Sequence, residues 1–179
     1  MPRLRWIACL CAALAGTAAQ ARPTNGPAVP GFGAIVPVPT AANTPDPHLR
    51  YRVMFSVTKA AEAPAKLSPS LDKVARFLNL LGSRGIRPEP NDIVVILHGP
   101  ATATALTDDA YRARFGVPNP NLPLIQALRR SGAAIHVCGQ ALAAQKIDPS
   151  MVSGDVTIDL SAMTTIATLQ LRGSALMPE

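Results

Sequence analysis

Two apolar, strand-like segments of this sequence each end in a residue that can do chemistry. The run DIVVILHG ends at His98 and Gly99, and the run AAIHVCG ends at Cys138 and Gly139. A cysteine reacts as its thiolate, and histidine accepts or donates a proton near neutral pH. If the sheet is parallel, both strand ends lie on the crevice side, and these side chains predict thiol chemistry with an imidazole nearby.

Cys138 is expected at the end of a strand, directly before a helix that begins near Gln140. The free amides and the dipole at a helix N-terminus favour an anion, so this helix is predicted to stabilise a solvent-open thiolate. The alternative is a small buried hydrophobe, because free cysteine is among the most buried residue types. Both interpretations stay open at this point.

His136 lies two residues before Cys138, so the two side chains share one face of the strand. It either tunes the thiol or is an ordinary packed histidine. No CxxC, HxxxH or carboxylate cluster accompanies these residues, and no metal site is predicted. The sequence also lacks GxGxxG after its first strand, GxxxxGK[ST] and GxSxG, which argues against nucleotide binding and serine-hydrolase chemistry.

Residues 1–21 have the three parts of a secretory signal peptide. Arg3 and Arg5 form a basic start, an apolar run follows, and Ala19-Gln20-Ala21 is a small-x-small cleavage site. Cleavage near Ala21 removes two of the three cysteines, and the expected location is a bacterial periplasm. A single cysteine in an oxidising compartment cannot form an internal disulfide, so Cys138 is either inert or kept for a purpose.

The charge balance argues against large polyanionic partners. Cleavage removes two of 17 basic residues and none of the 11 acidic ones, leaving a net charge of +4 that is scattered along the chain. This pattern predicts a solvated surface and no nucleic-acid binding. No second apolar run is long enough to span a membrane, so no membrane span is predicted.

Residues 22–48 are expected to form a proline-rich extended arm. Seven prolines and three glycines occur in residues 22–47, and proline fixes φ and removes a hydrogen-bond donor. The apolar side chains Phe32, Ile35, Val36 and Val38 have little use in a bare linker. They are predicted to dock on the body of the protein or on a neighbouring subunit.

Residues 49–179 are predicted to form one α/β domain, because strand and helix patterns alternate five times. The expected architecture is a mostly parallel five-stranded sheet with helices on both faces, and its ligand crevice lies beyond the carboxyl ends of the strands. Ser70, Thr107 and Ser161 are the expected helix caps. Met163 and its neighbours, at helical spacing, are expected in the core.

The chain from about Tyr51 to Pro178 resembles the DsrE/DsrF-like proteins of sulfur relay, most closely their exported single-domain branch. The matching stretches are HGPAT, AYRARFG, NPNLPLIQALRRSG, VCGQAL and SAMTTIATLQLRG, in the right order. The resemblance implies a Rossmann-like or flavodoxin-like fold and a homo-oligomer, a trimer or hexamer. It also implies that Cys138 carries a persulfide.

In this resemblance His98, Gly99, Gly139 and Gln140 line the site. No cofactor is implied beyond a cysteine-bound sulfane sulfur, and the partners would be a sulfur donor or acceptor protein or a small thiol. Whether the chain turns over a substrate is left open. A persulfide carrier or sulfurtransferase-like role is the first hypothesis. An oligomeric ligand- or partner-binding module with a structural cysteine is the second, and a redox-sensing thiol is a third.

Overall fold

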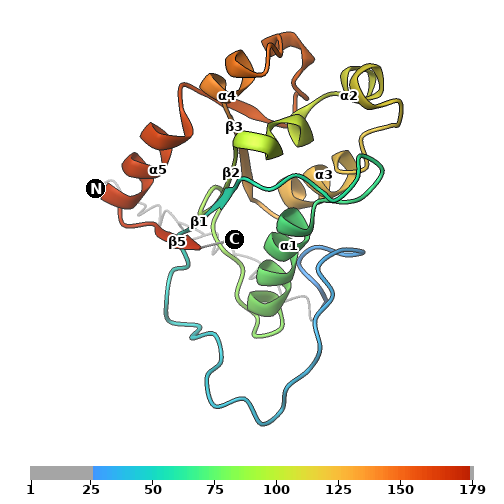
Figure 1. The fold of residues 1–179 in the computed structure, drawn as a ribbon. Helices are drawn as coiled ribbons and strands as arrows, with labels where there is room; N and C mark the ends of the chain where they lie inside the picture. Colours follow the sequence, from blue (N-terminus) through green and yellow to red (C-terminus); the bar gives the residue numbers. More distant parts are fainter. Residues whose placement is uncertain (1–25, 178–179) are drawn as a thin grey trace, which may run out of the picture.

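The structure is a computed structural model that describes residues 26–177, so the predicted signal peptide lies outside the described residues. The elements alternate between strand and helix along the chain (Figure 1). The strands are β1 (Val53–Val57), β2 (Ile93–Leu97), β3 (Ala134–Cys138), β4 (Thr157–Asp159) and β5 (Ala175–Met177). The α-helices are α1 (Pro69–Gly82), α2 (Asp108–Phe115), α3 (Leu122–Arg130), α4 (Gly139–Ala144) and α5 (Ala162–Leu171), with 3₁₀ turns η1 (Gly99–Ala105) and η2 (Pro149–Met151).

The five strands form one sheet in the order β4-β3-β2-β1-β5, and every neighbouring pair is parallel. This confirms the predicted α/β fold class. All five residues of β2 are buried, as expected for a continuous apolar run at the centre of a parallel sheet. The parallel arrangement brings the carboxyl ends of the strands to one edge, where the connections to η1, α4 and α5 begin.

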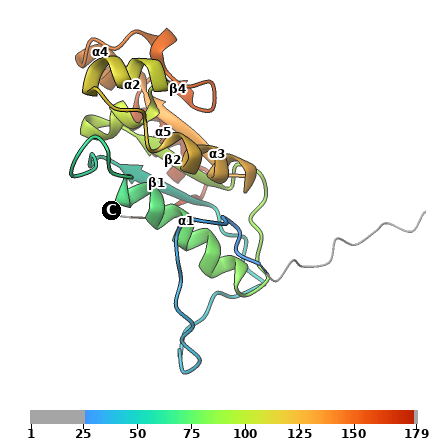
Figure 2. The same cartoon turned by 90° about the vertical axis from the view of Figure 1, so that its right-hand side faces the viewer.

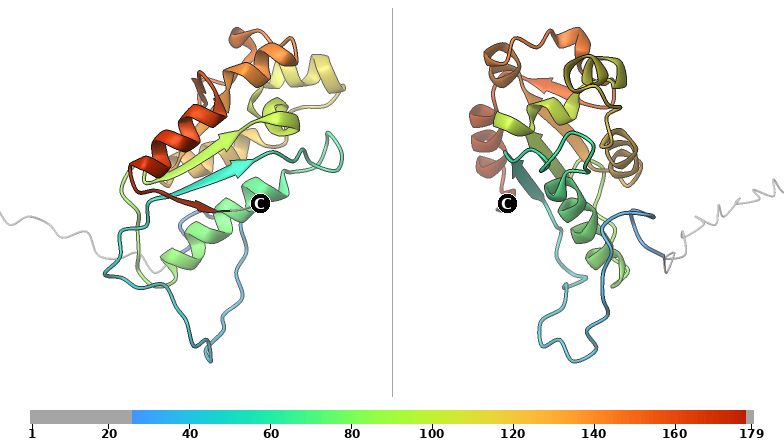
Figure 3. Two further views of the ribbon diagram at one scale, coloured as in Figure 1. Left: turned by 60° about the vertical axis from the view of Figure 1, so that its left-hand side comes forward. Right: turned by 45° about the vertical axis from the view of Figure 1, so that its right-hand side comes forward.

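Helices cover both faces of the sheet, in unequal amounts (Figure 3). Helices α1 and α3 pack on one face, over a core that includes Ile135 and Val137 of β3. On the opposite face α5 packs over a smaller cluster that contains Ala134 and Cys138 of the same strand. The alternation of side chains along β3 therefore places Cys138 beneath α5.

Two of the three predicted helix caps are confirmed. The hydroxyl groups of Thr107 and Ser161 accept hydrogen bonds from the first turns of α2 and α5. The prediction for α1 is wrong, because Ser68 is its N-cap and accepts from the amide of Leu71. Ser70 lies inside the helix, since Pro69 occupies the first helical position, where its missing N–H costs nothing.

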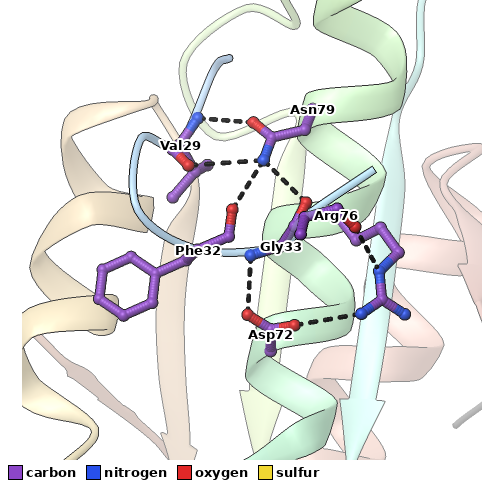
Figure 4. A network of polar contacts seen from close by, with 7 residues as sticks. Val29, Phe32, Gly33, Asp72, Arg76 and Asn79 are labelled. Carbon is purple, nitrogen blue, oxygen red and sulfur yellow. Dashed lines mark hydrogen bonds and ion pairs between the residues drawn. The ribbon is translucent and has the colours of Figure 1, made fainter. Parts of the chain in front are cut away.

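The first described part of the arm is docked on α1. The side chain of Asn79 accepts a hydrogen bond from the amide of Val29 at 2.8 Å and donates to the carbonyls of Phe32 and Gly33 at 2.8 and 3.0 Å (Figure 4). Asp72 accepts from the Gly33 amide at 2.7 Å. Val29 is fully buried, so this segment completes the core on the α1 side.

The rest of the arm leaves the body. Phe32 packs against the core, as predicted, but Val36 and Val38 are 80% and 64% exposed. The chain from there to β1 forms a long loop that extends away from the sheet and helices (Figure 2). No part of the body buries these two valines, so docking on the body accounts for only the beginning of the arm.

The outer side of α5 carries exposed apolar side chains. Met163 is 78% exposed, which overturns the prediction that it belongs to the core. Leu160 and Leu171 are 76% and 90% exposed. Helix α5 is therefore apolar on two sides, because Ile166 and Leu169 pack toward the sheet while its outward side is more apolar than a solvated face requires.

Candidate functional site at the carboxyl ends of β2 and β3

The structure places His98 and Cys138 at the ends of adjacent parallel strands. Leu97 pairs with Val137, so the next residue of each strand, His98 and Cys138, lies at the same level of the sheet. Gly99 follows with a φ of +54°, a left-handed conformation that glycine adopts without strain and that starts the 3₁₀ turn η1. The sheet is parallel, so both strand ends lie at its carboxyl edge, as the sequence interpretation required.

Cys138 is buried rather than open to solvent. Its residue is 6% exposed, and it packs with Met54, Ile96 and Ala162 in the cluster under α5. The predicted environment is wrong in a second respect: Cys138 makes no cap hydrogen bond with α4, and its Sγ accepts from the amide of Ala162 at 3.3 Å. The donor for an anionic sulfur is thus the first residue of α5.

The close packing of Gly139 explains this geometry. A Cβ atom at Gly139 would lie 2.7 Å from the carbonyl oxygen of Asp159 and 3.4 Å from that of Leu160. Only glycine lets the start of α4 approach the connection between β4 and α5 so closely. This approach brings the first turn of α5 over Cys138, and the role of Gly139 is therefore to shape the site.

The imidazole of His98 turns toward β1. Its Nε2 atom is hydrogen-bonded to the hydroxyl of Ser56 at 2.8 Å. Because β1 and β3 flank β2 on opposite sides, this nitrogen faces away from Cys138. The structure therefore brings the two residues to one edge of the sheet and gives Nε2 of His98 a partner other than the thiol.

His136 forms a hydrogen-bonded group with two residues that the sequence prediction missed. Its Nδ1 lies 2.9 and 3.0 Å from the two carboxylate oxygens of Asp159, and the hydroxyl of Thr165 donates to Asp159 at 2.7 Å. A signal for Asp159 is present in the sequence, since it ends the strand DVTID. The pairing of Cys138 with Asp159 could not be predicted from the sequence, because this pairing depends on the strand order.

The remaining predicted residue, Gln140, is exposed and donates weakly to the carbonyl of Leu160 at 3.4 Å. The side chain that reaches η1 is Gln145, whose Nε2 donates to the carbonyl of Gly99 at 2.7 Å. Gln145 links the end of α4 to the turn after β2. The connections that follow β2 and β3 are therefore linked by Gln145, five residues after the predicted Gln140.

A trough runs along one side of α5 and includes His136 and Asp159 in its lining. Its volume is about 640 Å³, and within the described chain its lining does not include Cys138 itself. The floor comes from β2 and β3, the wall from α5, and one end from β4. We define this trough by its lining residues, Arg52, Asn91, Val94, Ala134, His136, Asp159, Leu160, Thr164, Thr165, Thr168, Leu169 and Arg172.

Two kinds of function receive no support from residues 26–177. None of the helices described there is both long enough and apolar enough to cross a membrane. In the same residues no three side chains of the histidine, cysteine, aspartate and glutamate types come together as a metal site would require.

The fold and the site define an α/β protein with a fully parallel five-stranded sheet and a buried thiol, that of Cys138, at the end of its third strand. The model of the DsrE/DsrF-like family matches residues 51–178, and this chain belongs to that family. The comparison with curated proteins gives no match. A similar solved structure is that of MTH1491 from Methanobacterium thermoautotrophicum, a protein of unknown function.

The likeness to MTH1491 has a TM-score of 0.53 at 19% sequence identity, over 72% of this chain and 99% of that chain. At this identity it shows the fold alone. The chemistry therefore rests on the residues of the site.

Proposed function

We propose that this protein is an exported sulfur carrier in which Cys138 holds a persulfide. Family membership supports sulfur relay at the family level. The observation that carries the proposal is the hydrogen bond from the Ala162 amide to Sγ of Cys138 at 3.3 Å. A backbone amide at the start of a helix stabilises a thiolate, and the thiolate is the reactive form of cysteine.

Loading of the carrier is a single exchange of sulfur bonds. The thiolate of Cys138 attacks the outer sulfur of a donor R–S–SH, the S–S bond of the donor breaks, and R–S⁻ leaves. The product is Cys138–S–SH, so one S–S bond forms and one breaks with no external oxidant. No second cysteine is needed for this step.

The burial of Cys138 sets a condition on this chemistry. With 6% exposure, the sulfur is reached only when the first turn of α5 moves away from the end of β3. The same burial favours the second candidate function, a binding module in which the cysteine is structural. The two candidates differ in whether a reagent reaches the thiol of the folded protein.

Intact-mass analysis after treatment with polysulfide tests the proposal. The folded protein is expected to gain about 32 Da, one sulfur atom, at Cys138, and the Cys138→Ser variant is expected to gain nothing. Iodoacetamide labelling of the folded and the urea-unfolded protein measures access to the same thiol. No sulfur gain by the folded protein, together with labelling only after unfolding, would leave the structural role as the better description.

The exposed apolar side chains of α5 support a homo-oligomer, proposed as a trimer or hexamer. Met163 and Leu171 are exposed on α5 and Leu160 is exposed just before it, and large exposed apolar patches mark interaction sites. Light scattering coupled to size-exclusion chromatography measures the number of subunits. The Met163→Lys variant should shift the mass toward the monomer, and an unchanged mass would place the interface elsewhere.

The proposed location is the bacterial periplasm, and it rests on the N-terminal sequence. Residues 1–21 combine the basic start, the apolar run and the small-x-small site of a secretory signal. Cell fractionation with N-terminal sequencing tests this directly. A mature protein that begins near Arg22 in the periplasmic fraction is the expected result, and an uncleaved cytosolic chain would contradict it.

A further inference from the structure

The trough along α5 has features of a binding site that the carrier role does not by itself require. It combines an apolar floor, formed by Val94 and Ala134, with polar groups at both ends. Its volume of about 640 Å³ lies in the range of small-molecule sites. Few polar groups on a mostly preformed apolar surface are typical of sites that hold an organic ligand in one orientation.

One end of the trough carries two arginines without carboxylate partners. Arg52 lies just before β1 and Arg172 just after α5, and the pairing of β1 with β5 brings them together, since Ala175 donates to the carbonyl of Arg52. Within residues 26–177 neither guanidinium takes part in a salt bridge. Arginine recognises carboxylates through paired N–H donors, so this end fits the anionic group of a ligand.

The other end of the trough carries His136, held in one orientation. Its Nδ1 is hydrogen-bonded to both oxygens of Asp159, and Thr165 donates to the same carboxylate. A carboxylate accepts, so Nδ1 carries the hydrogen and Nε2 of the neutral ring is an acceptor. In the described part of the chain Nε2 has no hydrogen-bond partner, which leaves it to accept a proton from a ligand.

The separation of the two ends sets the size of the ligand. Thr164, Thr168 and Arg172 follow one another at one-turn spacing along the wall. The span from residue 164 to residue 172 is about 12 Å at 1.5 Å per residue. A tripeptide in an extended conformation covers roughly 10 Å, so a ligand of this size fits along the α5 wall of the trough.

We propose that the trough along α5 binds a small organic acid bearing a thiol, with its carboxylate at Arg52 and Arg172 and its thiol at Nε2 of His136. The choice of a thiol over another proton donor rests on the proposed carrier function. Cys138 lies two residues beyond His136 on the same face, about 6.6 Å along the strand. The bound molecule is then the acceptor of the sulfur that Cys138 carries.

The transfer step follows from this placement. The ligand thiol R–SH gives its proton to Nε2 of His136, and R–S⁻ attacks the outer sulfur of Cys138–S–SH. The S–S bond of the persulfide breaks as the new one forms, giving R–S–SH and the Cys138 thiolate. Once the first turn of α5 closes again over Cys138, the Ala162 amide donates to the departing sulfur, and the charge on the imidazolium balances that on the thiolate.

Reduced glutathione, a tripeptide thiol with two carboxylates, is the probe for binding. Calorimetric titration of the full chain should show binding that the Arg52→Gln/Arg172→Gln double variant weakens at least tenfold. Arg130→Gln is the matched control, because Arg130 ends α3 on the opposite face of the sheet. Arg172→Glu alone, checked by thermal unfolding, gives a second test if the double variant folds poorly.

The transfer step has its own readout. In protein loaded with sulfur to the same extent by mass, His136→Gln should slow formation of glutathione persulfide about tenfold or more, since a positioned base contributes at least that much. S-methylglutathione should bind but accept no sulfur. Equal rates of glutathione persulfide formation by His136→Gln and the parent protein would show that His136 does not act as the base.

The binding and carrier proposals can fail separately. The Cys138→Ser variant should bind glutathione as the parent does, because Cys138 does not line the trough. Binding without any sulfur loading would refute the carrier and leave a binding site. Sulfur loading without glutathione binding, or binding that is unchanged in the double arginine variant, would overturn the trough proposal and leave the carrier proposal standing. A second copy of the chain found covering the trough would have the same consequence.

Discussion

The contact between the arm and α1 gives a prediction whose size can be worked out. Asn79, at 3% exposure, makes three hydrogen bonds of 3.0 Å or less with the arm, and a fourth of 3.4 Å to the carbonyl of Val29. At about 1 kcal/mol net for each of the three, Asn79→Ala should cost the docked arm about 3 kcal/mol. Since 1.4 kcal/mol is a factor of ten, this is roughly a hundredfold in the docking equilibrium.

Native-state hydrogen exchange measures that equilibrium at two arm amides. Those of Val29 and Gly33 donate to Asn79 and Asp72, and their protection should fall about a hundredfold in Asn79→Ala. Thermolysin, which cleaves before apolar residues, should then cut the arm. The melting temperature should fall less than it would if global unfolding lost the full 3 kcal/mol or so, because an undocked arm leaves the sheet intact.

Asn43→Ala is the matched control, since Asn43 lies in the exposed part of the arm. It should change neither protection nor cleavage. If Asn79→Ala keeps the protection of Val29 within a few-fold of this control, the side-chain network does not hold the arm, and a contact with a neighbouring subunit becomes the better explanation.

Two further substitutions test the packing that surrounds the site. Gly139→Ala places a Cβ 2.7 Å from the carbonyl oxygen of Asp159, so it should lower the free energy of unfolding by about 1–3 kcal/mol and change sulfur loading. Gly154→Ala is the control, because a Cβ at Gly154 would lie in open space. Equal urea midpoints for the two variants would contradict the close packing of Gly139. Tyr111→Phe removes the hydrogen bond to the carbonyl of Pro64 and should cost about 1 kcal/mol at neutral pH. Burial raises the pKa of Tyr111, so its contribution is fully present below the unfolded value of about 10 and is lost at higher pH. The parent should therefore lose more stability than Tyr111→Phe as the pH rises above about 10, and parallel pH curves from urea unfolding would contradict this.

The parts of the fold that depend on local signals could be predicted from the sequence. The apolar run of β2 and the hydroxyl caps at Thr107 and Ser161 require only neighbours in the chain. The N-cap at Ser68 is marked in the sequence by Pro69, because proline favours the first helical position, whereas Ser70 is closer to the first apolar residue of the helix, Leu71. The burial of Val29 depends on a contact with Asn79, 50 residues away, and no periodic pattern marks it.

The site was predicted in position but not in environment. Cys138 ends β3 as expected, yet the amide that reaches it belongs to Ala162, 24 residues later. That contact exists because β4 pairs with β3 and returns the chain over the strand end, which is a property of the strand order. The exposure of Met163 was missed for a related reason, because helical spacing tells which residues share a face but not which way the face points.

The first turn of α5 links the thiol to the trough. Ala162 donates to Cys138, and Thr165, three residues on, donates to the carboxylate that orients His136. Because both hydrogen bonds come from one turn of α5, the proposed transfer requires the sulfur to be exposed while Thr165 still holds Asp159. A contact on the exposed apolar side of α5 bears on both hydrogen bonds.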